Sequence, residues 1–420
     1  MKPGENNEQP RKIFSSGFWI LLAAIVATAV KLLLAWNTIG TNDTIVFFRC
    51  ARELTLQGLA ETYRQAILFT HPPLVAYYLR AIYELSNSAF FVQNNISFAF
   101  LLRLPGIVAD FVSSLVILKL AETLPGRRIP FWALLLFALN PISLMVSGFH
   151  GNTDSVMVMF VLLSCLMAAL PLPLFCGLFL GLSCQVKIVP VLLLPAFLLF
   201  WHHQRRLRPF IAAFIFTSVL LIFEPLLFSP GAYVKNVLSY GGYWGLWGFT
   251  YLIRSIQFQQ LNRISFFGLS PAAIIISNFL KFIVVCSVLF LAWRRRDSDA
   301  RGLVVTLAMS WLIFFIFAPG VAPQYFVWLT PFLLFVSPVF FAFFTGAASI
   351  FLFIFYSTIS HSIHWYFGVS TNALSAVWAP WSLLPWITLI LGSALIWRST
   401  RQPGAPLKIL TVVPAAEPYS

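Results

Sequence analysis

Charged residues are scarce in this chain, and their scarcity excludes most kinds of water-soluble domain. Of the 420 residues only 10% are Asp, Glu, Lys or Arg, whereas 60% are hydrophobic and the mean hydropathy is +0.86. Ordinary soluble domains carry about 25% charged residues. The composition is typical of a polytopic membrane protein, whose apolar side chains face lipid as well as one another.

Acidic residues and cysteines are the rarest of the reactive side chains. There are 13 Asp and Glu against 27 Lys and Arg, which gives a formal net charge of +14. The five cysteines are scattered, and all except Cys50 lie in apolar stretches, so neither a disulfide framework nor a cysteine metal site is indicated. Most basic residues stand at the ends of apolar stretches, and we therefore expect a lipid bilayer and no nucleic acid as partner.

The apolar stretches predict an all-α transmembrane bundle of about 12 spans, with a range of about 10 to 13. The expected spans are 17–37, 97–120, 131–148, 154–170, 172–186, 188–201, 210–228, 271–293, 303–318, 326–343, 345–360 and 376–397. We divide the chain into a cytoplasmic N-terminus (1–16), a membrane domain (17–397) and a cytoplasmic tail (398–420). The tail contains several prolines and few apolar anchors, which predicts disorder.

Lys and Arg are distributed unequally between the two sides of this topology. With the N-terminus in the cytoplasm, 16 of them lie inside, eight lie outside and three lie within spans. The excess inside supports this orientation and places both termini in the cytoplasm. The outer face would then be the periplasm for a bacterial inner membrane or the lumen for the endoplasmic reticulum. The modest length and the lack of organelle-retention signals favour the bacterial membrane.

Two outer segments, 38–96 and 229–270, are too long to be simple turns, and we expect function there. The first predicts two amphipathic helices. One is bounded by Asn42-Asp43 as cap and Gly58 as stop, and the other starts at Pro72-Pro73. The apolar face of the first predicted helix consists of Phe47, Cys50, Ala51 and Leu54.

The polar residues that are not cytoplasmic anchors converge on the outer ends of the spans. They are Asp43, His71, His150, Asn152, Asp154, Lys187, Gln324, Tyr325, His361 and His364. A transporter would place ionisable residues near the middle of the membrane, often in repeated halves. Asp110 has such a place, and Arg103 two turns before it on the same face predicts a buried ion pair. The placement of the polar residues favours chemistry at the outer membrane surface.

The segments around these residues resemble the GT-C glycosyltransferases, multi-span enzymes that take a sugar from a polyprenyl-phosphate donor. Thr41-Asn42-Asp43-Thr44 follows the first span, and Thr70-His71-Pro72-Pro73-Leu74 is similar to the Pro-Pro-Leu element of the dolichyl-phosphate-glucose glucosyltransferases. Asn140-Pro141 and the segment Phe149–Ser155 follow. The segments Gly181–Pro190 and Pro323–Trp328 resemble elements of the GPI mannosyltransferase branch.

The resemblance implies a GT-C-like fold and an inverting transfer of a hexose, mannose or glucose, to a glycan, lipid or protein acceptor at the outer face. It also implies that Asp43 is the general base, which suits the chemistry because a sugar hydroxyl is a weak nucleophile. The alternative is that Asp43 only caps the helix that follows it. Thr44 and Ile45 replace the Asp-x-Asp pattern of some relatives, so a bound divalent metal is not favoured and no cofactor is predicted.

The remaining polar residues of the outer face are predicted to bind the substrate or the donor phosphate. This set comprises His71, His150, Asn152, Asp154, Lys187, Gln324, Tyr325, His361 and His364. Each has a structural alternative: the histidines could equally well be satisfied structural residues, Asp154 suits the positive end of a helix, and Lys187 could snorkel to the interface. His361 and His364 stand three apart, which puts both imidazoles on one helical face, but no third metal ligand is evident.

Two other classes of protein stay open as alternatives. In a membrane transporter or lipid flippase, Asp110, Arg103, Lys281 and Glu224 would be the transport residues. In a membrane O-acyltransferase, His361 would react with acyl-CoA on the cytoplasmic side. The predicted outer location of His361 and of the polar residues favours the glycosyltransferase.

Overall fold

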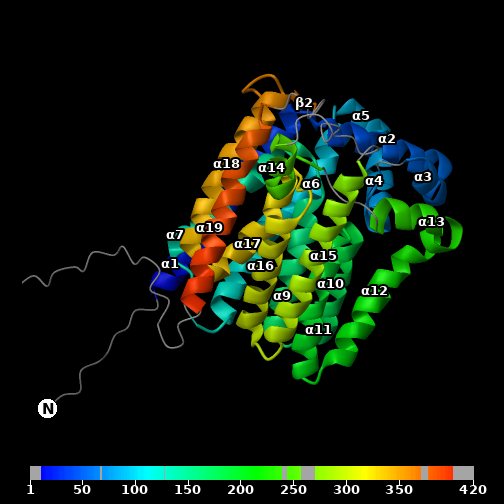
Figure 1. Ribbon diagram of the computed structural model, residues 1–420. Coiled ribbons are helices and arrows are strands. Elements are labelled where there is room, and N and C mark those ends of the chain that lie inside the picture. The colour runs from blue at the N-terminus through cyan, green and yellow to red at the C-terminus, as the bar shows by residue number, and fades with distance from the viewer. Residues whose placement is uncertain are drawn as a thin grey trace, which may run out of the picture.

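The structure, a computed structural model, describes residues 11–66, 69–126, 128–238, 244–256, 270–369 and 377–400. The predicted tail beyond residue 400, the first ten residues and much of the predicted outer segment 229–270 lie outside these ranges. Almost all described residues are helical, and the long helices run side by side in a single bundle (Figure 1). The prediction of a polytopic helical bundle is confirmed.

Eight helical stretches of the described residues are long and apolar enough to cross a membrane. They lie in α1 (Arg11–Asn37), α6 (Phe98–Thr123), the run Phe131–His150, α12 (Leu207–Phe228), α15 (Pro271–Arg294), α16 (Ala300–Phe317), α18 (Pro338–Ile359) and the stretch Ala379–Ile396 that ends in α19 (Leu383–Thr400). The run Phe131–His150 consists of α7 (Phe131–Ala138), α8 (Pro141–Met145) and the π-helical turn η1 (Val146–His150).

Four shorter apolar helices stand at the other predicted spans. They are α9 (Asp154–Ala169), α10 (Pro173–Val186), η2 (Val189–Leu193) with α11 (Leu194–His203), and η4 (Pro323–Tyr325) with α17 (Phe326–Val336). Eight spans therefore satisfy the criteria of length and composition, and the count of about twelve stays a prediction.

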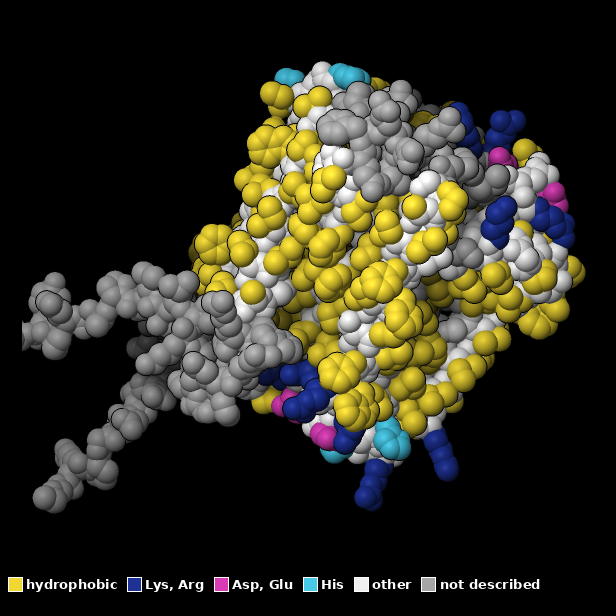
Figure 2. Space-filling view, viewed as in Figure 1, with side chains coloured by type: hydrophobic (Ala, Val, Ile, Leu, Met, Phe, Trp, Pro, Cys, Tyr) yellow, Lys and Arg dark blue, Asp and Glu magenta, His cyan; other side chains and the backbone are white. Residues whose placement is uncertain are grey.

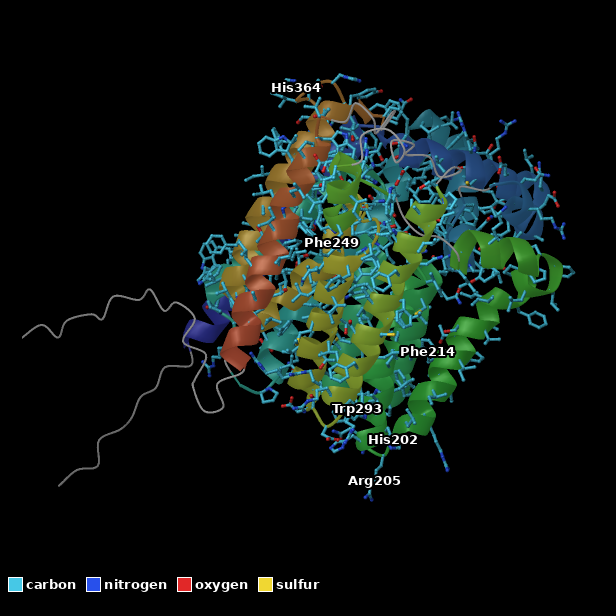
Figure 3. All side chains as sticks on the ribbon, in the orientation of Figure 1. His202, Arg205, Phe214, Phe249, Trp293 and His364 are labelled. Atoms are coloured by element: carbon cyan, nitrogen blue, oxygen red, sulfur yellow. The ribbon has the colours of Figure 1, made fainter. Side chains whose placement is uncertain are left out.

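Short helices cover one end of the bundle, the end that we predict to be non-cytoplasmic (Figure 1). They are α2 (Asn42–Gln57), α3 (Leu59–Gln65), α4 (Pro73–Ser86), α5 (Ala89–Gln93), α13 (Pro230–Tyr233), η3 (Val234–Leu238) and α14 (Gly248–Ile256). His202, Arg205 and Trp293 lie at the opposite end (Figure 3). Hydrophobic side chains form the surface between the two ends, as expected for a band that contacts lipid (Figure 2).

Both helices predicted in the first outer segment are present. Helix α2 ends at Gly58, whose φ of 81° favours glycine, and the predicted face of Phe47, Cys50, Ala51 and Leu54 is buried. Helix α4 begins at Pro73. The predicted cap was wrong by one position, because Thr41 is the N-cap of α2 and no side chain caps this helix.

The predicted boundary between the spans 326–343 and 345–360 was wrong. Helix α17 ends at Val336, and α18 begins at Pro338. The reason is local: the Ser337 hydroxyl accepts a hydrogen bond from the Phe340 N–H, and proline at the first helical position lacks the N–H that would be unpaired there. The uninterrupted apolar composition of this region concealed the helix break.

The predicted pairing of Arg103 with Asp110 was also wrong. The Asp110 carboxylate accepts hydrogen bonds from Lys31 Nζ and from Ser143 Oγ, each at 2.7 Å. Arg103 instead donates to Thr38 and to the carbonyl oxygens of residues 148 and 149. Side chains on a helix tilt toward its N-terminus, so Arg103, which precedes Asp110, extends away from it toward the end of α1.

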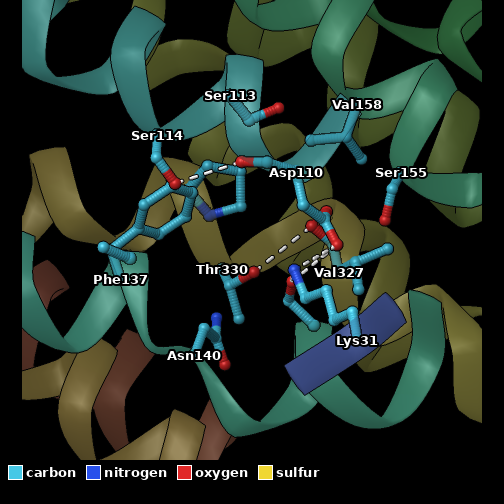
Figure 4. Close-up of a pocket in the computed structure, with 13 residues that line it drawn as sticks. Lys31, Asp110, Ser113, Ser114, Phe137, Asn140, Ser155, Val158, Val327 and Thr330 are labelled. Atoms are coloured by element: carbon cyan, nitrogen blue, oxygen red, sulfur yellow. Dashed lines mark hydrogen bonds and ion pairs between the residues drawn. The ribbon is translucent and has the colours of Figure 1, made fainter. Parts of the chain in front are cut away.

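The Lys31–Asp110 pair lines a small polar cavity inside the bundle, together with Ser113, Ser155 and Thr330 (Figure 4). Charged groups at this depth would be costly unless they were paired, and both are. The pair joins α1 to α6 and, through Ser143, to α8. Its position supports a role in holding these three helices together.

Helix α10 packs against α12 through two glycines spaced four apart. A Cβ atom on Gly177 would stand 2.2 Å from the Phe210 carbonyl oxygen, and one on Gly181 would stand 2.8 Å from Thr217 Cβ. Small residues at this spacing allow transmembrane helices to approach closely. The two helices can therefore be separated by adding a single methyl group.

We expect Gly177→Ala to destabilise the protein by about 1–3 kcal/mol, because the new methyl group must displace backbone atoms of α12. The measurement is the midpoint of denaturant-induced unfolding in detergent micelles. Gly346→Ala in α18 is the matched control, since a Cβ atom added there would meet nothing within 4 Å and alanine favours helix. Equal midpoints for the two variants would contradict the proposed close contact.

Candidate active site

The segment that precedes Asp43 is fixed on two sides. Strand β1 (Gly40–Thr41) pairs in parallel with β2 (Phe367–Gly368), which follows α18. The Thr41 hydroxyl also donates to the His150 carbonyl oxygen at 2.9 Å. Gly40 has a φ of 97°, and a Cβ atom there would lie 2.6 Å from the Phe149 carbonyl oxygen, so only glycine fits. Asp43 lies in the first turn of α2, directly after this fixed segment.

The Asp43 carboxylate is held through one of its two oxygens. Its Oδ2 lies 3.1 Å from His150 Nε2 and accepts a hydrogen bond from Asn152 Nδ2 at 3.2 Å. Among the described residues no hydrogen bond reaches Oδ1, and the side chain is 30% exposed. This arrangement fixes the carboxylate and leaves one oxygen able to accept a further proton donor.

The backbone around His150 brings both of these partners to Asp43. The chain leaves the bundle through the π-helical turn η1, and Gly151 then adopts a left-handed conformation with φ 81°. A Cβ atom on Gly151 would lie 2.7 Å from Thr44 Oγ1, which again requires glycine. π-Helical turns are rare and occur frequently at functional sites. The motif Phe149–Ser155 therefore serves to present His150 and Asn152 to α2.

The charges near Asp43 favour its ionised form. Burial raises the pKa of Asp43, but the hydrogen bond with His150 and the nearby positive charge of Lys187 help to outweigh it, and the pKa is held below the ordinary 3.8. Burial, with the charge of Lys187, lowers the pKa of His71 to about 4. At neutral pH Asp43 is therefore an anion and His71 is uncharged.

Lys187 is buried in an ion pair next to this carboxylate and does not snorkel to solvent. Its Nζ donates to Asp154 Oδ1 at 2.7 Å, and the two side chains are 11% and 0% exposed. The ammonium group stands 4.6 Å from the centre of the Tyr325 ring and 5.3 Å from that of Trp328, within the range of cation–π attraction. Trp328 Nε1 donates to the same Asp154 oxygen at 2.5 Å. Lys187 is thereby held in one place.

The structure brings most of the predicted site residues together. Asp43, His150 and Asn152 are in direct contact, while Lys187, Asp154 and Tyr325 form the neighbouring group, with Gln324 adjoining in η4. His71 joins the two groups: its Nδ1–H donates to the Val186 carbonyl oxygen beside Lys187, and its ring lies against Phe47 of α2.

His361 and His364 are not part of this cluster. Both are exposed, and His364 lies beyond the end of the bundle (Figure 3). The idea that they share a helical face was wrong, because α18 ends at Ile359 and His361 has a φ of 54°. In the part of the chain that the structure describes, no three His, Cys, Asp or Glu side chains are grouped to hold a metal.

Two residues of the site were not predicted. The Tyr356 hydroxyl of α18 lies 3.0 Å from His150 Nδ1, and Trp328 donates to Asp154. Trp328 closes the motif Pro323–Trp328 and was detectable there. Tyr356 stands in an apolar helix outside every motif, and only the packing of α18 against the turn at His150 reveals it.

Comparison with known proteins finds a family match for part of the chain. Residues 70–228 match the family of dolichyl-phosphate-mannose-protein mannosyltransferases, whereas no curated protein matches the chain. The matched region contains His71, His150, Asn152, Asp154 and Lys187. The match confirms the resemblance to the GT-C glycosyltransferases.

Together with the multi-span bundle, the family match indicates a membrane glycosyltransferase of the GT-C class. The family also supports a sugar donor that is linked to a lipid. Asp43 precedes the matched region, and Tyr325, Trp328 and Tyr356 follow it. The contacts of these four residues with the matched region join them to the same site.

Proposed function

We propose that this protein transfers a hexose, mannose or glucose, from a polyprenyl-phosphate donor to a glycan, lipid or protein acceptor, with Asp43 as general base. The observation that carries the proposal is the Asp43 carboxylate: ionised, partly exposed, fixed through Oδ2 by His150 and Asn152, and adjacent to a buried cation. Such a group is suited to accept the proton of a weak nucleophile.

The reaction proposed is a single displacement with inversion at the anomeric carbon. The acceptor hydroxyl donates its proton to Asp43 Oδ1 while its oxygen forms a bond to the anomeric carbon. The bond from that carbon to the phosphate oxygen breaks on the opposite side, and the polyprenyl phosphate leaves with the electron pair. A phosphate is a stable anion, so this leaving group needs no acid.

Lys187 supports the proposed phosphate site. The ammonium group of Lys187 is held between Asp154 and the rings of Tyr325 and Trp328. The side chain is therefore not free to move with the phosphate. A fixed cation beside the leaving group stabilises negative charge without reorganisation. The neutral His71, whose Nδ1–H is donated to the Val186 carbonyl oxygen, offers Nε2 as an acceptor for a hydroxyl group of the sugar.

The membrane location fits the proposed donor. An isoprenoid tail stays in hydrocarbon while its phosphate lies at the membrane surface, and the short helices α2–α5 lie at the end of the bundle that we assign to that surface (Figure 1). We propose that this surface faces the periplasm of a bacterial inner membrane and that both termini are cytoplasmic, in line with the positive-inside distribution.

The direct test is transfer of labelled sugar by the purified protein in lipid vesicles. We expect transfer from synthetic polyprenyl-phosphate-mannose or polyprenyl-phosphate-glucose to a membrane extract that supplies acceptors. Vesicles without protein and the nucleotide-linked forms of the same sugars are the controls. Transfer from the nucleotide sugar alone, or from neither polyprenyl donor by folded protein, would contradict the proposal.

A further inference from the structure

A line of three side chains runs from the interior of the bundle to the proposed base. The Tyr356 hydroxyl lies 3.0 Å from His150 Nδ1, and His150 Nε2 lies 3.1 Å from Asp43 Oδ2. Tyr356 is fully buried and His150 nearly so, whereas Asp43 is partly exposed. The three residues come from α18, η1 and α2, which are far apart in the sequence.

The Tyr356 hydroxyl and the ionised Asp43 carboxylate select the same protonation of the imidazole. Within the described residues His150 Nδ1 is the hydrogen-bond partner of the Tyr356 hydroxyl. If Nδ1 carried a proton, it would donate to the hydroxyl oxygen and leave the buried O–H proton without an acceptor. A buried unpaired donor is costly, so the O–H donates to a bare Nδ1. The proton of neutral His150 is then on Nε2, where it points at Asp43.

We infer that Tyr356 is a positioning residue that acts through His150: it keeps the imidazole in the tautomer whose Nε2–H holds Asp43 Oδ2. The inference rests on the proposed function of Asp43. With Oδ2 occupied by His150 and Asn152, the proton of the acceptor is directed to Oδ1. The opposite tautomer would set a nitrogen lone pair against the carboxylate and turn Asp43 away from its position.

The packing around the three residues supports this role. The His150 and Tyr356 rings stand edge to face with centroids 5.7 Å apart, and Phe149 and Trp365 pack against Tyr356. Among the described residues, His150 Nδ1 is the partner given for the hydroxyl. The contact therefore has one geometry, which is what the control of a tautomer requires.

The test is Tyr356→Phe, assayed for sugar transfer at neutral pH. Without the hydroxyl the imidazole loses the donor at Nδ1 that holds the ring. We therefore expect the variant to transfer sugar about tenfold or more slowly than the wild-type protein. We expect this loss of activity to appear in kcat and not in KM, because the binding sites for acceptor and donor are unchanged.

Other charged groups around His150 and Asp43 remain the same in both proteins, so the ratio of variant to wild-type activity isolates the effect of the hydroxyl. These groups are Arg103 of α6, Lys187, Asp154 and His71, with the Lys31–Asp110 pair deeper in the bundle. A loss of activity that appears in KM and not in kcat would show that Tyr356 is only structural and would overturn the inference.

Two further variants separate the tautomer from general damage to the fold. Tyr78→Phe also removes a tyrosine hydroxyl, in this case one that donates to the Leu101 carbonyl oxygen, and its activity should be close to that of the wild-type protein. His150→Gln keeps an N–H donor near the position of Nε2 that needs no tautomer. In that background we expect Tyr356→Phe to change transfer less than twofold.

The outcomes distinguish this inference from the proposed function. If the wild-type protein transfers no sugar, the proposed function fails. If the wild-type protein is active and Tyr356→Phe equals it, or lowers activity equally in the His150→Gln background, the positioning role of Tyr356 fails while the function stands.

Discussion

Asp43→Asn is expected to lower sugar transfer by about 10²–10⁴-fold, the contribution of a positioned general base. The amide has nearly the same shape and can still contact Asn152 and His150, but it cannot accept the proton of the acceptor hydroxyl. The pKa of Asp43 is held below its ordinary value, so the wild-type base is fully ionised at neutral pH. The measurement is the initial rate of label transfer at equal amounts of folded protein, at saturating donor.

Glu61→Gln is the matched control for this substitution. It makes the same change of carboxylate to amide on a neighbouring outer helix, where Glu61 pairs with Arg64 near the surface. Exposed pairs of this kind contribute little, and less than a twofold change in transfer is expected. If Asp43→Asn retained full activity, Asp43 would be removed from the mechanism, and Asp154 would be the next carboxylate to test.

Lys187→Met is expected to have the second largest effect, and it should lower both the stability of the protein and its rate of sugar transfer. Removing one partner of a buried ion pair leaves Asp154 charged and without its cation, which costs about 3–5 kcal/mol of folding free energy. Loss of the proposed phosphate contact should also lower kcat/KM for the donor by about 10–100-fold, the equivalent of a charge-assisted hydrogen bond. The unfolding midpoint and the transfer rate measure these effects separately.

The double variant Lys187→Met with Asp154→Asn distinguishes the two roles. It removes both charges, so most of the lost stability should return, while transfer stays low because no cation faces the donor phosphate. Recovery of transfer together with stability would contradict the phosphate-binding role. Lys119→Met is the control, since Lys119 forms an exposed pair with Glu122 and should change neither quantity measurably.

Much of the fold followed from hydropathy alone, because an unpaired backbone in lipid leaves helices as the only solution for apolar stretches of this length. The positions at which helices are interrupted were harder to predict. The break at Ser337 depends on a single cap in a uniformly apolar region, and the sequence composition on either side is the same. The partner of Asp110 was missed for a different reason: it lies on α1, and contacts between distant spans leave no trace in the spacing of residues.

The candidate site was predicted as a set of residues on one face, and eight of its ten members do lie at one cluster. The contacts between these residues could not be predicted from the sequence. Lys187 was predicted to neutralise the donor phosphate, with snorkelling to the interface as the alternative, and its contacts with Asp154 and two aromatic rings were not foreseen. Tyr356 has no motif around it. Its role depends on a turn of η1 that only the folded chain defines.

The short parallel pairing of β1 with β2 makes the completion of the chain a condition for activity. Gly40 and Thr41 emerge early during synthesis, but their partners Phe367 and Gly368 are more than 300 residues further on. Until α18 is inserted, neither the strand beside Asp43 nor the ring at His150 has its support. A partly synthesised protein therefore lacks β2 beside the segment of Asp43 and the Tyr356 hydroxyl at His150, and we expect sugar transfer only after the last spans have entered the membrane.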